Sequence, residues 1–157
     1  MKLRLLATDP DPVLLQIYRA YFPYFGFEVV TAGDGLECLE LLRDFLPDAL
    51  ILSLELTWGG AEGVLAIVRE ETAMRPIPVV LTFDQISRPK AVKHLLPPVV
   101  KLLEKPFLLN DLQAGVEAAL GARADRPGPG AVDRSTAFSG TDGRAADKHN
   151  PLTTRMA

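Results

Sequence analysis

The sequence predicts an α/β domain in which a parallel β-sheet is covered by helices on both faces. Five short apolar stretches alternate with five segments whose apolar residues recur at helical spacing. The third stretch, residues 49–52, is apolar at every position, as expected for a central strand with both faces covered. In such sheets, ligands and reacting groups lie just beyond the carboxyl ends of the strands. The chemistry of the protein is therefore expected beside Ser53, where this stretch ends.

The order of the elements follows from breaks in these patterns. Residues 3–7 form an apolar run before an acidic loop, where Asp11 is suited to cap a helix and Pro12 to occupy its first position. Gly26 separates this helix from the second strand. The strands are predicted at residues 3–7, 27–31, 49–53, 78–82 and 99–103. The helices are predicted at residues 12–22, 34–45, 61–72, 87–96 and 111–120, the last capped by Asn110 and ended by Gly121.

Composition limits the class of protein. The 157 residues, of which 48% are hydrophobic, suffice for one domain, and a net charge of −3 provides no broad basic field for nucleic acid. The single Cys38 cannot form an internal disulfide, and no Cys/His cluster has metal-ligand spacing. The apolar run at the N-terminus is too short for a signal peptide or a membrane span. A cytoplasmic protein is therefore expected.

The last part of the chain has a different composition. Residues 122–157 are rich in Gly, Pro, Ala, Ser and Thr and contain six Lys or Arg and four Asp. They offer too little apolar surface to offset the entropy of ordering, so we predict a disordered tail. The net charge of +2 on this tail leaves −5 on residues 1–121, which form the predicted domain.

Several landmarks occur together in one order. They are Pro12 closing the first acidic loop, Gly26 before the second strand, Pro47-Asp48 before the third, Thr82 ending the fourth, and Lys105-Pro106-Phe107 after the fifth. Over residues 1–121 this set resembles the receiver domain of bacterial response regulators. The resemblance implies a flavodoxin-like (βα)5 fold with strand order 2-1-3-4-5. It also implies a pocket at the carboxyl ends of strands one, three, four and five.

Receiver domains of two-component (phosphorelay) signal transduction take a phosphoryl group from a histidine kinase onto an aspartate, helped by Mg²⁺. Ser53 stands at the phospho-accepting position, six residues after Pro47. Asp9 takes the first acidic position and Pro10 the second, which usually ligates the metal; Asp11 reaches it only by a shift of register. With one of three carboxylates left, no cofactor is expected, and Mg²⁺ binding is expected to be lost.

Other positions of the implied pocket have a structural interpretation. Lys105 is expected to pair with Asp9 rather than to serve catalysis, because an unpaired half-buried ammonium is costly. Thr82 is interpreted as a remnant hydroxyl satisfied by the backbone. Phe83 stands where the family usually has a small residue, and Leu102 where a switching aromatic is usual. No catalytic residue is predicted, and the protein is not expected to be an enzyme.

A candidate interaction surface combines an aromatic residue with basic ones. Trp58 lies in a loop two residues longer than usual, where it would either be exposed at an interface or fold over the altered pocket. The basic members are Arg88, Lys90, Lys93, His94 and Lys101. A signalling or kinase-like protein with an acidic patch is expected to bind the face formed by helix four, strand five and helix five. The same face could also form a homodimer. Neither nucleic acid nor a membrane is expected as a partner.

The sequence thus favours a pseudo-receiver that is not phosphorylated and acts through protein–protein interaction. One alternative is a working phosphoacceptor that uses an offset carboxylate, Asp48, Asp11 or Glu55. Another is a flavin- or nucleotide-binding protein of the same fold. It ranks last, because no Gly-rich phosphate loop follows the first strand.

Overall fold

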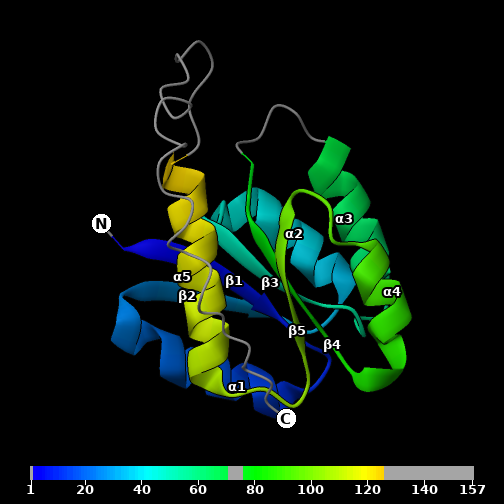
Figure 1. Ribbon diagram of the computed structural model, residues 1–157. Helices are drawn as coiled ribbons and strands as arrows, with labels where there is room; N and C mark the ends of the chain where they lie inside the picture. The colour runs from blue at the N-terminus through cyan, green and yellow to red at the C-terminus, as the bar shows by residue number, and fades with distance from the viewer. Residues whose placement is uncertain (1, 71–75, 126–157) are drawn as a thin grey trace, which may run out of the picture.

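The computed structural model describes residues 2–70 and 76–125 of the chain. Within these residues the strands form one parallel sheet in the order β2-β1-β3-β4-β5 (Figure 1), so the expected flavodoxin-like fold is confirmed. The strands are β1 Leu3–Thr8, β2 Phe27–Ala32, β3 Ala49–Ser53, β4 Val79–Phe83 and β5 Val99–Glu104. The helices are α1 Pro12–Tyr21, α2 Gly35–Phe45, α3 Gly60–Glu70, α4 Arg88–Lys93 and α5 Leu109–Asp125, with 3-10 turns η1 Phe22–Phe25 and η2 Gln85–Ser87.

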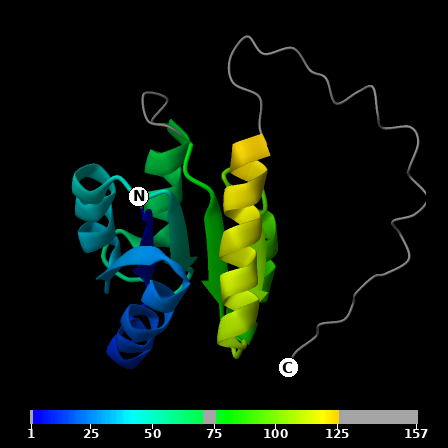
Figure 2. The same cartoon turned by 90° about the vertical axis from the view of Figure 1, so that its left-hand side faces the viewer.

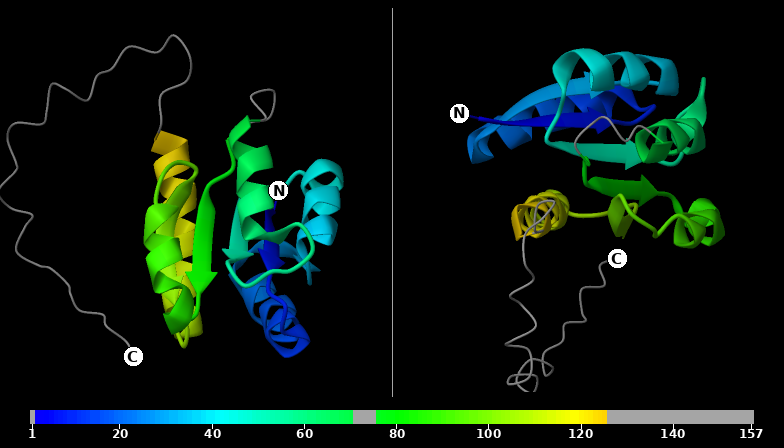
Figure 3. Two further views of the ribbon diagram at one scale, coloured as in Figure 1. Left: turned by 90° about the vertical axis from the view of Figure 1, so that its right-hand side faces the viewer. Right: turned by 90° about the horizontal axis from the view of Figure 1, so that it is seen from above.

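Two apolar layers hold the sheet between its helices (Figures 2 and 3). Helices α1 and α5 cover one face, and α2, α3 and α4 cover the other. Along β3, Ala49 and Ile51 belong to the first layer, whereas Leu50 and Leu52 belong to the second. Both faces of β3 are therefore buried, which explains its uninterrupted apolar sequence. None of the helices in the described residues has the length and apolar character that crossing a membrane requires.

Two helix ends differ from the prediction by several residues, and α5 begins at Leu109, so Asn110 lies within this helix and the prediction that it caps α5 is wrong. Helix α4 ends at Lys93 rather than at residue 96, and η2 precedes it. Pro97 follows Leu96, and a residue before proline is disfavoured in the helical conformation. Gly121 does not end α5, which continues to Asp125. Alanines surround this glycine, and the strong helix preference of alanine tolerates the cost of one glycine, about 1 kcal/mol. The rest of the predicted tail, from residue 126, and the predicted end of the third helix lie outside the described residues.

The strand register brings the predicted site residues to one edge of the sheet. Ser53 of β3 is paired with Thr82 of β4, and Phe83 of β4 with Glu104 of β5. Because the strands are parallel, the residues that follow β1, β3, β4 and β5 emerge at this same edge. We call the group Asp9, Ser53, Glu55, Thr82 and Lys105 the strand-end site.

Candidate functional site

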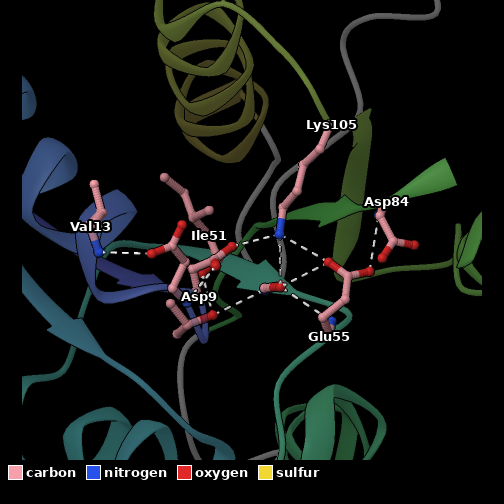
Figure 4. Close-up of polar contacts among 9 residues, drawn as sticks. Asp9, Val13, Ile51, Glu55, Asp84 and Lys105 are labelled. Carbon is pink, nitrogen blue, oxygen red and sulfur yellow. Dashed lines mark hydrogen bonds and ion pairs between the residues drawn. The ribbon is translucent and has the colours of Figure 1, made fainter.

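Lys105 forms the centre of the strand-end site. Its ammonium lies between two carboxylates (Figure 4), 2.6 Å from Oδ2 of Asp9 and 2.9 Å from Oε1 of Glu55. Asp9 is 2% exposed, whereas Glu55 and Lys105 keep 22% and 23% of their side-chain exposure. The predicted pair of Lys105 and Asp9 is thus present, and Glu55 adds a second anion.

The electrostatics of Lys105 follow from these contacts. Burial lowers the pKa of its ammonium, because a charge is disfavoured away from water. The hydrogen bonds and negative charges of Asp9 and Glu55 outweigh burial, so the pKa of Lys105 is raised above its ordinary value. The lysine therefore stays charged at neutral pH. As an ammonium bound to two carboxylates, it has no lone pair to serve as a base or nucleophile.

Ser53 is fully buried, and its hydroxyl is held in place from several sides. The hydroxyl donates to Oε1 of Glu55 at 3.3 Å and accepts from the Glu55 N–H at 3.2 Å and from Nζ of Lys105 at 3.4 Å. The Ser53 N–H donates to Oγ1 of Thr8 at 3.0 Å, and that hydroxyl donates to the Ile51 carbonyl at 3.1 Å. A serine at this position thus stabilises the end of β3. Within the described residues no histidine contacts its hydroxyl; the carboxylate that accepts from it, Glu55, is itself bound to Lys105.

The loop after β1 holds the acidic residues predicted for a metal site. Oδ1 of Asp9 accepts the Asp11 N–H at 2.9 Å, while Oδ1 of Asp11 accepts the Val13 N–H at 2.9 Å. Asp11 therefore caps α1, as predicted, and does not take the place of Pro10 beside Lys105. Pro10 itself is exposed and its side chain carries no donor or acceptor.

Glu55 is the site residue that sequence reasoning underestimated. The sequence indicates it only as an alternative phosphoacceptor, yet it links three strand ends. Besides its contacts to Ser53 and Lys105, its Oε2 accepts the Asp84 N–H at 3.0 Å. Asp84 in turn accepts the Ser87 N–H at 3.0 Å and so begins the turn that leads into α4. β3 ends at Ser53, and the turn that follows brings Glu55 back to the Ser53 hydroxyl, so no local sequence pattern signalled this contact.

Asp48 was the third offset carboxylate considered, and the structure places it elsewhere. It precedes β3 and accepts the Arg4 N–H at 2.8 Å, near the amino end of β1. The strand-end site lies at the opposite edge of the sheet. Asp48 therefore lies away from the strand-end site.

The donors at the strand-end site do not suit Mg²⁺. Asp9 and Glu55 both bind the Lys105 ammonium, whose single positive charge balances one of the two carboxylates. Among the described residues, no group of three or more His, Cys, Asp or Glu side chains could hold a metal ion. Mg²⁺ needs near-octahedral oxygen ligands and gives up water reluctantly. Two carboxylates that both bind the same lysine provide a poor ligand set.

Thr82 departs from the prediction. Its side chain is fully buried, but Oγ1 has no hydrogen-bond partner among the described residues. The expectation that the backbone satisfies this hydroxyl is therefore wrong. Phe83, the next residue, is also buried and packs in the core beneath α4. Its large side chain is accommodated there and not over the strand-end site.

The candidate interaction surface is divided by the fold. Trp58 is 71% exposed, so of its two expected positions the structure supports the exposed one. Arg88 forms a two-point ion pair with Glu104 at 2.8 Å, and His94 lies 3.2 Å from Glu62 of α3. The three lysines are exposed, on α4 and β5: Lys90, Lys93 and Lys101. The residues predicted to meet one partner thus occupy more than one face.

This fold and this site define a receiver-like α/β domain in which a lysine bridges the strand-end carboxylates. Among curated proteins, the response regulator MprA of Mycobacterium leprae is 31% identical over 137 residues, which cover 87% of this chain and 58% of MprA. The DNA-binding response regulator MtrA of Mycolicibacterium smegmatis is 28% identical over 127 residues, 81% of this chain and 54% of MtrA. The chain thus spans a little over half the length of these relatives. No protein-family model matches it.

Solved structures show the same fold. A response regulator receiver domain protein from Clostridium thermocellum superimposes with a TM-score of 0.69 at 19% identity, covering 78% of this chain and 97% of that one. A response regulator receiver protein from Sinorhizobium medicae gives a TM-score of 0.67 at 22% identity, with coverages of 78% and 97%. Sequence relatives and fold together support a response regulator receiver domain in this chain.

Proposed function

We propose that this receiver domain transmits information by protein–protein contact and is not phosphorylated on an aspartate. The observation that carries the proposal is the state of the phospho-accepting position. Ser53 is buried, and Glu55, Lys105 and Thr8 hold it by hydrogen bonds. A phosphoryl donor would have to displace Glu55 to approach that hydroxyl.

The loss of metal binding is part of the same proposal. Pro10 supplies no ligand, and the carboxylates of Asp9 and Glu55 are both bound to the Lys105 ammonium. Without a divalent cation, the negative charge that develops during phosphoryl transfer would have Lys105 alone to stabilise it. We therefore propose that the domain needs neither Mg²⁺ nor another cofactor and is not an enzyme.

Contacts at the strand-end site also support a fixed arrangement of the α4 region. Glu55 holds the Asp84 N–H, Asp84 caps η2, and the Lys105 N–H donates to the Phe83 carbonyl at 2.8 Å. Glu55 therefore supplies a built-in negative charge that orders the segment leading to α4. In this proposal, the surface that partners meet is already ordered when no phosphoryl group is present.

The test is treatment with a small phosphodonor and Mg²⁺, followed by intact-mass measurement. We expect no stable acyl-phosphate adduct, whereas a receiver with an intact aspartate, treated in parallel, should gain one phosphoryl group. A stable adduct on this chain overturns the proposal. The Ser53→Asp variant should also remain unmodified, because Pro10 still denies the metal a ligand. Modification of this single variant would mean that Asp11 occupies the second acidic position.

A second candidate function is phosphoacceptance by Glu55. The observation in its favour is that this carboxylate is partly exposed and lies 2.9 Å from Nζ of Lys105. If an adduct forms, its loss in Glu55→Gln but not in Asp11→Asn assigns it to Glu55. An absorbance spectrum of the purified protein tests the flavin alternative, for which we expect no flavin bands.

The partners of the whole protein are a further part of the proposal. The relatives are response regulators, one of them described as DNA-binding, but the chain spans only about half of their length. For the receiver domain we propose a signalling or kinase-like protein partner in the cytoplasm, not nucleic acid or a membrane. The exposed Lys90, Lys93 and Lys101 favour contacts at α4, β5 and α5, for a partner or for a second copy of the chain.

A further inference from the structure

A second exposed surface lies away from α5, where the loop after β3 meets the start of α2. Trp58 of this loop is 71% exposed and Leu36 of α2 is 58% exposed. Gly59 lies against Leu36, since a Cβ atom at Gly59 would be 3.8 Å from Cδ2 of that leucine. Two large apolar side chains are thus presented to solvent from adjoining segments. We call this pair the Trp58–Leu36 surface.

The loop is held firmly against α2. The Gly35 N–H donates to the Thr57 carbonyl at 2.9 Å. A Cβ atom at Gly35 would lie only 2.6 Å from the Trp58 carbonyl oxygen and 2.8 Å from the Gly60 nitrogen, so only glycine permits this approach. Trp58 itself has a φ of +49°, which is unfavourable for a residue with a side chain. The fold therefore fixes the backbone at Trp58, and its indole is exposed.

The surroundings of this surface are acidic. The two segments that build it, residues 33–40 and 54–63, contain Asp34, Glu37, Glu40, Glu55 and Glu62 and no Lys or Arg. Glu55 is paired with Lys105, and Glu62 with His94. Glu37 and Glu40 are exposed, and Asp34 is partly exposed at the start of α2. Two exposed apolar side chains beside a helix that carries the exposed carboxylates of Glu37 and Glu40 suit a ligand that is both apolar and cationic.

We propose that the Trp58–Leu36 surface binds a segment of a partner protein in which Arg or Lys alternates with apolar residues. The inference rests on the proposed contact function and concerns a second surface, separate from the exposed lysines of α4 and β5. An Arg side chain can stack on the indole face, where the cation is attracted by the ring, while its neighbour covers Leu36. Carboxylates at the rim select positive charge and repel anionic surfaces such as nucleic acid and acidic membranes.

Fluorescence offers a direct test, because Trp58 is the only tryptophan in the chain. The probe is a short peptide of alternating Arg and Leu, titrated into the full chain at low ionic strength. We expect a saturable shift of the tryptophan emission that weakens as salt is added. Matched peptides of Glu and Leu, or of Arg and Ser, should produce much weaker changes, because they lack the charge or the apolar part.

Variants locate the binding. By calorimetry, Trp58→Ala and Leu36→Ala should each weaken the Arg–Leu peptide about tenfold or more. Ile86→Ala is the matched control, because Ile86 is 88% exposed on η2, outside this surface. The affinity of this variant for the Arg–Leu peptide should match that of the unaltered protein. Amide resonances of residues 33–37 and 57–62 should move on binding. Unfolding curves will show whether each variant is folded.

Three results would overturn the proposal: no binding of the Arg–Leu peptide, equal binding of the Glu–Leu peptide, or undiminished binding by folded Trp58→Ala. A dimer of the chain that Trp58→Ala abolishes would assign the surface to a second copy and would also overturn it. Failure of this proposal can be distinguished from failure of the proposed function. The proposed function is tested by intact mass after phosphodonor treatment, whereas these titrations contain no phosphodonor.

Discussion

Removing the Lys105 ammonium should strongly destabilise the domain. In Lys105→Ala, the carboxylate of Asp9 would remain only 2% exposed. Among the described residues, the Asp11 N–H would be its one remaining hydrogen-bond donor. Breaking a buried ion pair from one side costs about 3–5 kcal/mol, whereas an exposed pair contributes at most about 1 kcal/mol. Lys105 is 23% exposed, so we expect the lower end, about 3 kcal/mol. Glu55 can recover water and should add little.

Urea denaturation at neutral pH measures this free energy of unfolding. The double variant Asp9→Asn, Lys105→Ala serves as the matched control, because it has no buried charge left to strand. It should recover more than half of the loss caused by Lys105→Ala. If Lys105→Ala costs less than about 1 kcal/mol, Asp9 is not a stranded buried charge, and the proposed basis of the site is refuted.

The pH dependence provides an independent check. The contacts with Asp9 and Glu55 raise the pKa of Lys105 above its ordinary value of 10.5. A group whose pKa is raised in the folded state stabilises the fold fully below its unfolded pKa and loses this contribution as the pH rises through the folded pKa. The difference in stability between the unaltered protein and Lys105→Ala should therefore be constant near neutral pH. It should shrink above about pH 10.5, and a difference that grows there would contradict the ion pair.

Three further substitutions test other features. Gly35→Ala should destabilise the domain by about 1–3 kcal/mol in urea, because its Cβ would meet the Trp58 carbonyl; an unchanged midpoint contradicts the close approach. Trp58→Gly should leave stability equal or raise it by up to about 1 kcal/mol, because the positive φ is relieved; a marked loss would show that the indole is part of the packing. Thr82→Val should raise the unfolding free energy by about 1 kcal/mol by removing an unpaired buried hydroxyl, whereas destabilisation would reveal a partner for that hydroxyl.

The sequence predicted the sheet because the breaks between its patterns have strong local causes. Asp11 and Pro12 mark the start of α1, and both occupy the predicted cap and first positions. The pair of Lys105 and Asp9 was also predictable, since parallel strands deliver their carboxyl ends to one edge. The ends of α4 and α5 were harder to predict. A residue before proline is disfavoured in a helix, as at Pro97, whereas the alanines around Gly121 allow α5 to continue.

Contacts between separate loops could not be derived from local patterns. Glu55 binds the N–H of Asp84, which lies 29 residues further along the chain, and only the register of β3 and β4 brings them together. The exposure of Trp58 could not be predicted either, because it depends on how closely the loop after β3 packs against Gly35. Sequence reasoning thus identified the edge that carries the site but missed the side chain that connects its strands.

The carboxylate of Glu55 is part of the chain, and this has a consequence for timing. A phosphoryl group on a receiver is added and later removed by hydrolysis, so the signal that it carries has a lifetime. The link from Glu55 to Lys105 and Asp84 lasts as long as the fold itself. In the proposed function, the amount of protein and the supply of its partner would then determine how long a signal persists.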